Sequence, residues 1–181
     1  MYGTIPAAVK QLLQEEYEAE VNRFKRESKQ ISADELAKRH FARYDSLLDQ
    51  CRYGNTHLRQ ASIAQTVIDT LFYWDNKRIE LIAFCVMANH VHVVLTVLDG
   101  EDNTLDSLLQ SMKSFSAREA TKKLGLSGKF WEEESYDRLV RDDDELIRIV
   151  RYVLQNPVKA GLCSQWRDWP WSYVKEEYDM F

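Results

Sequence analysis

The spacing of the apolar residues changes near residue 79 of this chain. Before that point apolar side chains recur every three or four positions, which is the period of an amphipathic helix. The pattern predicts one helix over residues 5–28, a second from Ser32 to about residue 50, and a third that ends near Trp74. Ser32 and Glu35 have the spacing of a capping box, which favours a helix start at that point.

Two nearly continuous apolar runs follow, IELIAFCVM at 79–87 and VHVVLTVL at 91–98. Each run has the length and the β-branched content of a strand, and only the short connection Ala88-Asn89 separates them. The two runs therefore predict a buried antiparallel hairpin.

Two more helices are predicted after the hairpin. The stretch 103–106 suits the start of one of them, which we expect to end near Gly125. Asp142 suits the cap of the other, and we expect this helix to end at Asn156 because Pro157 cannot continue it.

Helices before and after a single hairpin favour an α+β fold with a small antiparallel sheet, rather than a parallel sheet. The 181 residues fit one domain, and no internal repeat or low-complexity linker divides them. We expect residues 1–181 to form that domain, with a helical N-terminal region at 1–50 and a core at 51–175.

The composition favours a cytoplasmic protein with a packed core. Hydrophobic residues make up 45% of the chain, which is enough to fold without disulfides. The 3 cysteines form an odd set without metal-site spacing, so we expect reduced thiols. We find neither a signal-peptide pattern at the start nor an apolar stretch long enough to span a membrane.

The net charge of −5 counts against a nucleic-acid binder, since such proteins are usually basic. The segment 113–123 is a local exception, because its basic residues Lys113, Arg118, Lys122 and Lys123 outnumber its single acidic residue. This segment has two interpretations: a helix face in contact with phosphates, or an ordinary solvated face.

His90 and His92 lie at the start of the second predicted strand, with one valine between them. Residues i and i+2 of a strand point to the same face, with their Cα atoms roughly 6.6 Å apart. Two imidazoles at this spacing can share one metal ion, which needs further ligands from elsewhere. The alternative is a pair of packing histidines, each with its own hydrogen bond.

Tyr152 lies on the predicted last helix, at the edge of its apolar stripe, and Asn156 follows one turn later. A phenol is a competent nucleophile once its proton is removed, although its ordinary pKa of about 10 means that it needs help at neutral pH. An amide oxygen can complete the coordination of a hard cation. The alternative for Tyr152 is a surface tyrosine that rests on its neighbours.

Taken together, these motifs resemble the single-tyrosine transposases of the HUH nuclease superfamily, and most closely their REP-associated branch. The matching stretches are MANHVHVVL (87–95), GKFWEEESYDRLVRDDDEL (128–146), RYVLQNPVKAGL (151–162) and WPWS (169–172). The pair of histidines alone is a weak motif, whereas its combination with the tyrosine segment and the closing WPWS is specific.

The resemblance implies a fold, a site and a reaction. The fold would be a ferredoxin-like palm, with the tyrosine helix across the histidine face. His90 and His92 would hold a divalent metal, Mg²⁺ or Mn²⁺, with Asn156 as the third ligand. Tyr152 would attack single-stranded DNA beside a hairpin of a REP-like repeat and form a 5′-phosphotyrosine link. Ligand softness alone would also permit Zn²⁺ or Ni²⁺.

The resemblance also bears on the partners and on the N-terminus. We expect DNA contacts at Lys113, Arg118, Lys122, Lys123 and Lys159, no membrane partner, and a monomer or a homodimer. The alternative is a module that binds structured single-stranded DNA without cutting it. Family members usually open with an apolar strand before a segment like 2–6, so we expect the first strand of the sheet to be absent and an edge to be exposed.

Overall fold

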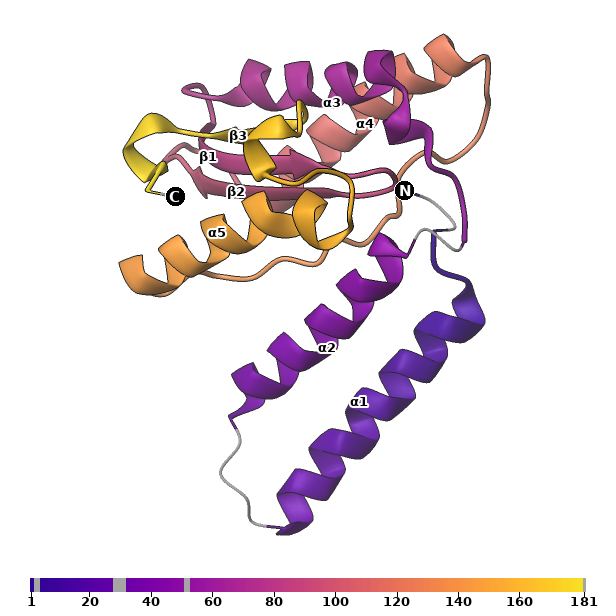
Figure 1. Ribbon diagram of the computed structural model, residues 1–181, viewed down its shortest axis with the longest axis vertical. Helices are drawn as coiled ribbons and strands as arrows, with labels where there is room; N and C mark the ends of the chain where they lie inside the picture. Colours follow the sequence, from indigo (N-terminus) through magenta and orange to yellow (C-terminus); the bar gives the residue numbers. More distant parts are fainter. Residues whose placement is uncertain (2–3, 28–31, 51–52, 181) are drawn as a thin grey trace.

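The computed structural model describes residues 1–181 apart from 2–3, 28–31, 51–52 and 181. Within the described part, five α-helices and a three-stranded antiparallel sheet form a mixed α+β fold (Figure 1). The predicted fold class, a small antiparallel sheet flanked by helices, is therefore confirmed. No helix among the described residues combines the length and the apolar composition that a bilayer span requires.

The first two helices form an antiparallel arm that extends away from the sheet (Figure 1). α1 spans Ala7–Glu27 and α2 spans Ala33–Asp49. Ser32 caps α2, since its hydroxyl accepts a hydrogen bond from the backbone N–H of Glu35 at 3.1 Å, as the capping pattern predicts.

The predicted hairpin is confirmed, and a third strand joins it. β1 (Ile79–Val86) pairs antiparallel with β2 (Val91–Val97) on one side and with β3 (Ser172–Val174) on the other. The sheet order is β2-β1-β3, so the longest strand is central. Sequence reasoning did not predict β3, because a strand of three residues within an aromatic tail carries no periodic signal.

The helices cover the two faces of this sheet unequally. α3 (Ala61–Trp74) and α4 (Leu105–Leu124) lie on one face, and α5 (Asp143–Lys159) lies on the other (Figure 1). The side chains of β1 are shared between two apolar clusters, one toward α3 and α4 and one toward α5. Burial on both faces explains why the sequence of β1 is almost continuously apolar.

A β-bulge interrupts the alternation of β1 side chains between these two clusters. Leu81 pairs with Leu95 and Ala83 pairs with Val94, which leaves Ile82 as an extra residue. Phe84 and Val86 point toward α3 and α4, whereas Cys85 points toward α5. Cys85 is the cross-strand partner of His92, and directly opposite residues of a sheet share a face. His92 therefore lies on the α5 side.

α4 begins within the predicted stretch 103–106. Thr104 forms a reciprocal capping box with Ser107, with hydrogen bonds of 3.2 and 3.3 Å. The Asn103 amide instead donates to the carbonyls of Leu98 and Arg78, so it holds the strand-to-helix connection together. Gly125 ends the helix in the left-handed conformation with φ 64°, as predicted.

α5 confirms the predicted start and corrects the predicted end. The Asp142 carboxylate accepts a hydrogen bond from the backbone N–H of Glu145 at 2.7 Å. The prediction that the helix ends at Asn156 was wrong, because α5 continues through Pro157 to Lys159. Pro157 is fully buried, and the ring removes only one backbone donor close to the natural end of the helix.

Candidate metal and nucleophile site

The two histidines lie on the same side of the hairpin, as the strand period predicts. Their Nε2 atoms are 3.1 Å apart, and their rings meet edge to face. The side chains are only 8% and 10% exposed, for His90 and His92 respectively. Val91 and Val93 point the opposite way and pack against the cluster under α3 and α4.

The amide of Asn89 sets the protonation of His90. Its Nδ2 donates to the carbonyl of Leu48 on α2 at 2.9 Å, so its Oδ1 faces Nδ1 of His90 at 2.6 Å. An amide oxygen only accepts hydrogen bonds, and therefore Nδ1 of His90 carries the proton and Nε2 keeps its lone pair. Burial, with a smaller effect of His92, lowers the pKa of His90 to about 3. The ring is thus neutral, as a metal ligand must be.

The arm contributes a third group to this site, the carboxylate of Asp45 on α2. One of its oxygens, Oδ1, lies 3.2 Å from Nε2 of His92 and 3.7 Å from Nε2 of His90. The other, Oδ2, accepts a hydrogen bond from the hydroxyl of Tyr152. Burial alone would raise the pKa of Asp45, but the interactions with His92 and Tyr152 outweigh burial and lower it.

A second carboxylate, Asp49, lies one turn further along α2. Its Oδ1 is 3.7 Å from Nε2 of His90. Burial, followed by the charge of Asp45, raises the pKa of Asp49 to about 6. Two carboxylates thus approach two histidines in a nearly dry space, which is an environment that favours a bound cation.

Tyr152 approaches the same group of side chains from α5. Its ring centroid lies 6.0 Å from that of His92, and its hydroxyl donates to Asp45. Burial, followed by the hydrogen bond to Asp45, raises the pKa of Tyr152. The ammonium of Lys159, one of the residues predicted to contact DNA, lies 4.0 Å from the centroid of the Tyr152 ring on the exposed side of α5.

Asn156 is fully buried one turn after Tyr152. Its Nδ2 donates to the carbonyl of Tyr152 at 3.4 Å, whereas its Oδ1 has no hydrogen-bond partner among the described residues. A buried amide oxygen without a partner is rare in folded proteins. This feature fits the predicted role of Asn156 as a ligand.

The residues present fit a divalent cation. Asp45, His90 and His92 each offer one ligand atom, and these atoms lie within 4.8 Å of one another. Imidazole nitrogens together with a carboxylate oxygen suit several first-row divalent metals as well as Mg²⁺. The donor set therefore indicates a metal centre without identifying the ion.

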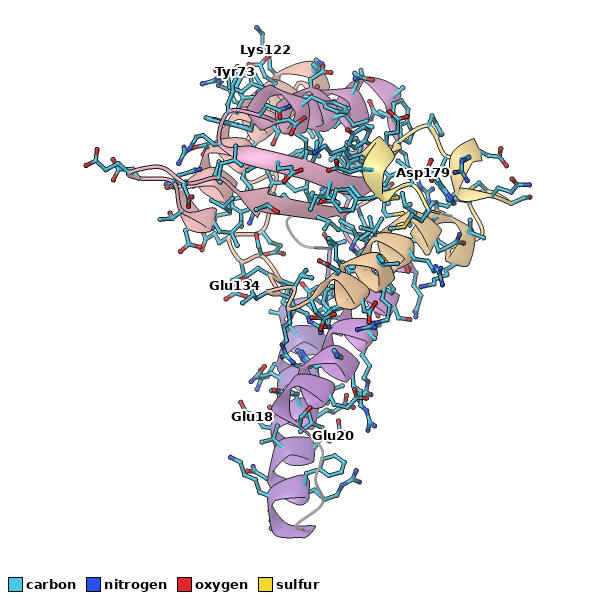
Figure 2. All side chains as sticks on the ribbon, turned by 90° about the vertical axis from the view of Figure 1, so that its left-hand side faces the viewer. Glu18, Glu20, Tyr73, Lys122, Glu134 and Asp179 are labelled. Carbon is cyan, nitrogen blue, oxygen red and sulfur yellow. The ribbon has the colours of Figure 1, made fainter. Side chains whose placement is uncertain are left out.

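Four of the five basic residues predicted to contact DNA do not reach this site, because they belong to α4 on the other face of the sheet. The Lys113 ammonium donates to the carbonyls of Glu132, Glu133 and Glu134. The Lys123 ammonium donates to the carbonyl of Ser62 and to the hydroxyl of Thr66. Arg118 and Lys122 are exposed. Figure 2 shows Lys122 at the end of the molecule opposite the arm.

Sequence reasoning missed Asp45 and Asp49. Both lie in the region that was expected to be a helical arm, more than 40 positions before the histidines in the chain. A signal was nevertheless present, since two carboxylates at i and i+4 share one face of a helix. Only the position of α2 against the sheet turns that face into part of a site.

Comparison with known proteins identifies the family. The sequence profile of the family described as "Transposase IS200 like" matches residues 53–156, which is more than half of the chain. The chain belongs to this family. The match includes His90, His92, Tyr152 and Asn156, whereas the arm and Asp45 lie outside the matched residues.

Individual relatives agree with the family match. The chain is 28% identical to a REP-associated tyrosine transposase of Haemophilus influenzae over 102 residues, covering 51% of the chain and 57% of the relative. It is 29% identical to one of Escherichia coli over 93 residues, covering 51% and 53%. The chain thus spans about half the length of these curated relatives.

A solved structure supports the same conclusion about the fold. It is a REP-associated tyrosine transposase bound to a REP hairpin, and it matches this chain with a TM-score of 0.53 and 25% identity. The match covers 65% of this chain and 67% of the other. The resemblance inferred from the sequence motifs is therefore confirmed at the level of the family and the fold.

Proposed function

We propose that this transposase-family chain cuts and rejoins single-stranded DNA through Tyr152. In this proposal the phenol oxygen attacks a scissile phosphate, the bond from phosphorus to the 3′ oxygen breaks, and a 5′-phosphotyrosine and a free 3′-hydroxyl result. One observation carries the proposal: a single carboxylate, Asp45, contacts both the Tyr152 hydroxyl and the paired histidines.

The side chains of the site have distinct roles in this reaction. His90 and His92 would hold a divalent metal, Mg²⁺ or Mn²⁺, and Asn156 would add its side-chain oxygen, which has no hydrogen-bond partner among the described residues. When bound, the ion supplies positive charge that offsets the negative charge of the phosphate and of its transition state. Asp45 already accepts the hydrogen bond of the Tyr152 hydroxyl, so it is the nearest acceptor for the phenol proton.

The proposed substrate is single-stranded DNA that carries a hairpin, as in REP-like repeats. A related transposase has been solved with a REP hairpin, which supports this class of partner. Lys159 lies beside the Tyr152 ring on the exposed side of α5, where its ammonium can contact a phosphate next to the cut. Arg118 and Lys122 stay a prediction for DNA that extends beyond the cut site.

A covalent-adduct assay tests the proposal. A labelled oligonucleotide with a hairpin and a single-stranded flank is incubated with the protein and Mn²⁺, and then denatured and separated by size. We expect a labelled protein band that is absent in Tyr152→Phe. The matched control is Tyr73→Phe, which removes the hydroxyl of an exposed tyrosine on α3 and should leave the band unchanged.

The alternative is a module that binds structured single-stranded DNA without cutting it. One observation favours it: the side chains of Asp45, His90 and His92 are no more than 10% exposed, which leaves a scissile phosphate little surface to contact. Retention of the hairpin on the protein, with no covalent band under Mg²⁺ or Mn²⁺, would support this alternative and overturn the reaction through Tyr152.

A further inference from the structure

The family match begins at residue 53, yet the two histidines are completed by a residue of the arm. We propose that Asp45 is itself a ligand of the divalent ion held by His90 and His92, so that metal binding fastens α2 to the catalytic face. This inference rests on the proposed function for the presence of the ion. It adds a ligand from outside the matched region and a structural consequence of metal binding.

The geometry of the three ligand atoms carries the first part of the proposal. Nε2 of His90 and Nε2 of His92 are 3.1 Å apart, and Oδ1 of Asp45 lies 3.2 and 3.7 Å from them. Neighbouring ligands of an octahedral ion, each bound at about 2.1 Å, lie roughly 3 Å apart. The three atoms thus have nearly the mutual spacing of ligands on one face of an octahedron.

The two oxygens of Asp45 are already divided between two tasks. Oδ2 accepts the hydrogen bond from Tyr152, whereas Oδ1 is buried and makes no hydrogen bond among the described residues. Within the same part of the chain, the basic side chains within 4.0 Å of the carboxylate oxygens of Asp45 and Asp49 are those of the two histidines. The negative charge of this buried oxygen is not offset by a hydrogen bond. A divalent ion bound between it and the two imidazole nitrogens would offset that charge.

The position of Asp45 on the arm gives the second part. α1 and α2 extend away from the sheet, and Glu18 and Glu20 lie far out along the arm (Figure 2). Near the base, α2 also meets the core through Asn89, which donates to the carbonyl of Leu48, and through Phe41, whose ring lies 6.3 Å from that of Tyr152. An ion shared by Asp45 and the histidines would join α2 directly to the hairpin.

Metal affinity tests the ligand. Isothermal titration calorimetry measures the affinity of Mn²⁺ for the wild-type protein, for Asp45→Ala and for Asp45→Asn. The asparagine variant keeps the shape of the side chain and replaces the alanine variant if the latter does not fold. Loss of the ligand should weaken binding at least tenfold, since even groups that only support a ligand are worth roughly that factor. The control Glu18→Ala removes the same charge at an exposed position far out on the arm and should leave binding unchanged.

The outcomes separate this inference from the proposed function. His90→Ala should abolish binding and so assign the titration to this site. Wild-type protein that binds no Mn²⁺ would overturn the metal-dependent function and this inference together. Binding that needs His90 but is equally tight without the Asp45 carboxylate would overturn only the assignment of Asp45.

Hydrogen exchange followed by mass spectrometry tests whether metal binding fastens α2 to the catalytic face. Saturating Mg²⁺ should slow exchange of the amides in the peptide covering residues 33–49 of wild-type protein, and should not do so in Asp45→Asn. Slower exchange in β2 without any change in α2 would show that the ion binds the hairpin but does not fasten the arm, which would overturn this part of the proposal.

Discussion

Asn89 shows how a single amide can organise a site in which it is not itself a proposed ligand. It is fully buried and makes two side-chain hydrogen bonds, one to the carbonyl of Leu48 on the arm and one to Nδ1 of His90. The first bond orients the amide, and the second aims the lone pair of Nε2 at the site. The sequence motif places Asn89 next to His90 but does not indicate this role.

We expect Asn89→Ala to lower metal affinity by roughly tenfold, because His90 then loses the partner that fixes its tautomer. The same change should lower the free energy of unfolding by about 1–3 kcal/mol, since the carbonyl of Leu48 and Nδ1 of His90 lose a buried partner. Mn²⁺ titration and urea denaturation measure the two effects. Asn55→Ala, at an exposed position, is the control. Unchanged metal affinity in Asn89→Ala would contradict the role of the amide.

At the scale of elements, local signals in the sequence account for most of the fold. Helix starts at Ser32 and Asp142 follow from side chains that cap their own backbone, and these were predicted correctly. The end of α5 was not predicted correctly, because the burial of Pro157 depends on tertiary packing, which a rule based on local sequence does not include. β3 was missed for a similar reason, since only its pairing with β1 makes residues 172–174 a strand.

The cap of α5 matters because this helix carries Tyr152 and Asn156. We expect Asp142→Ala to lower the free energy of unfolding by about 1 kcal/mol, since the backbone N–H of Glu145 loses its acceptor. Asp144→Ala, in the same exposed first turn, removes an equal charge but not the cap, and should cost less. Urea denaturation measures both variants. Equal losses would mean that charge near the helix end, rather than the cap, stabilises α5.

For the whole molecule, the site joins three segments that are distant in sequence: α2, the start of β2, and α5. The motifs predicted two of these segments, because each carries two candidate residues that are close together in the chain. These are His90 and His92 in one segment, and Tyr152 and Asn156 in the other. Asp45 was not predictable in this way, because its contact with Tyr152 spans 107 positions and depends on how the arm lies against the sheet. The segments that carry the candidate histidines and the tyrosine were therefore predicted, whereas the contribution of Asp45 and Asp49 from the arm was not.

With a net charge of −5, the proposed DNA binding would depend on local basic residues, and the two faces of the sheet offer different ones. We expect Lys159→Gln to weaken binding of a short single strand and to reduce the slope of log affinity against log salt by about 0.7, the value for one lost phosphate contact. Lys122→Gln, at the end of the molecule opposite the arm, should leave the short strand unaffected and weaken only a longer hairpin substrate. Fluorescence anisotropy between low and moderate salt measures both effects.

Hairpin binding that is equal in Lys122→Gln and wild type would exclude Lys122 from the DNA interface. An unchanged salt slope in Lys159→Gln would exclude the proposed phosphate contact beside Tyr152.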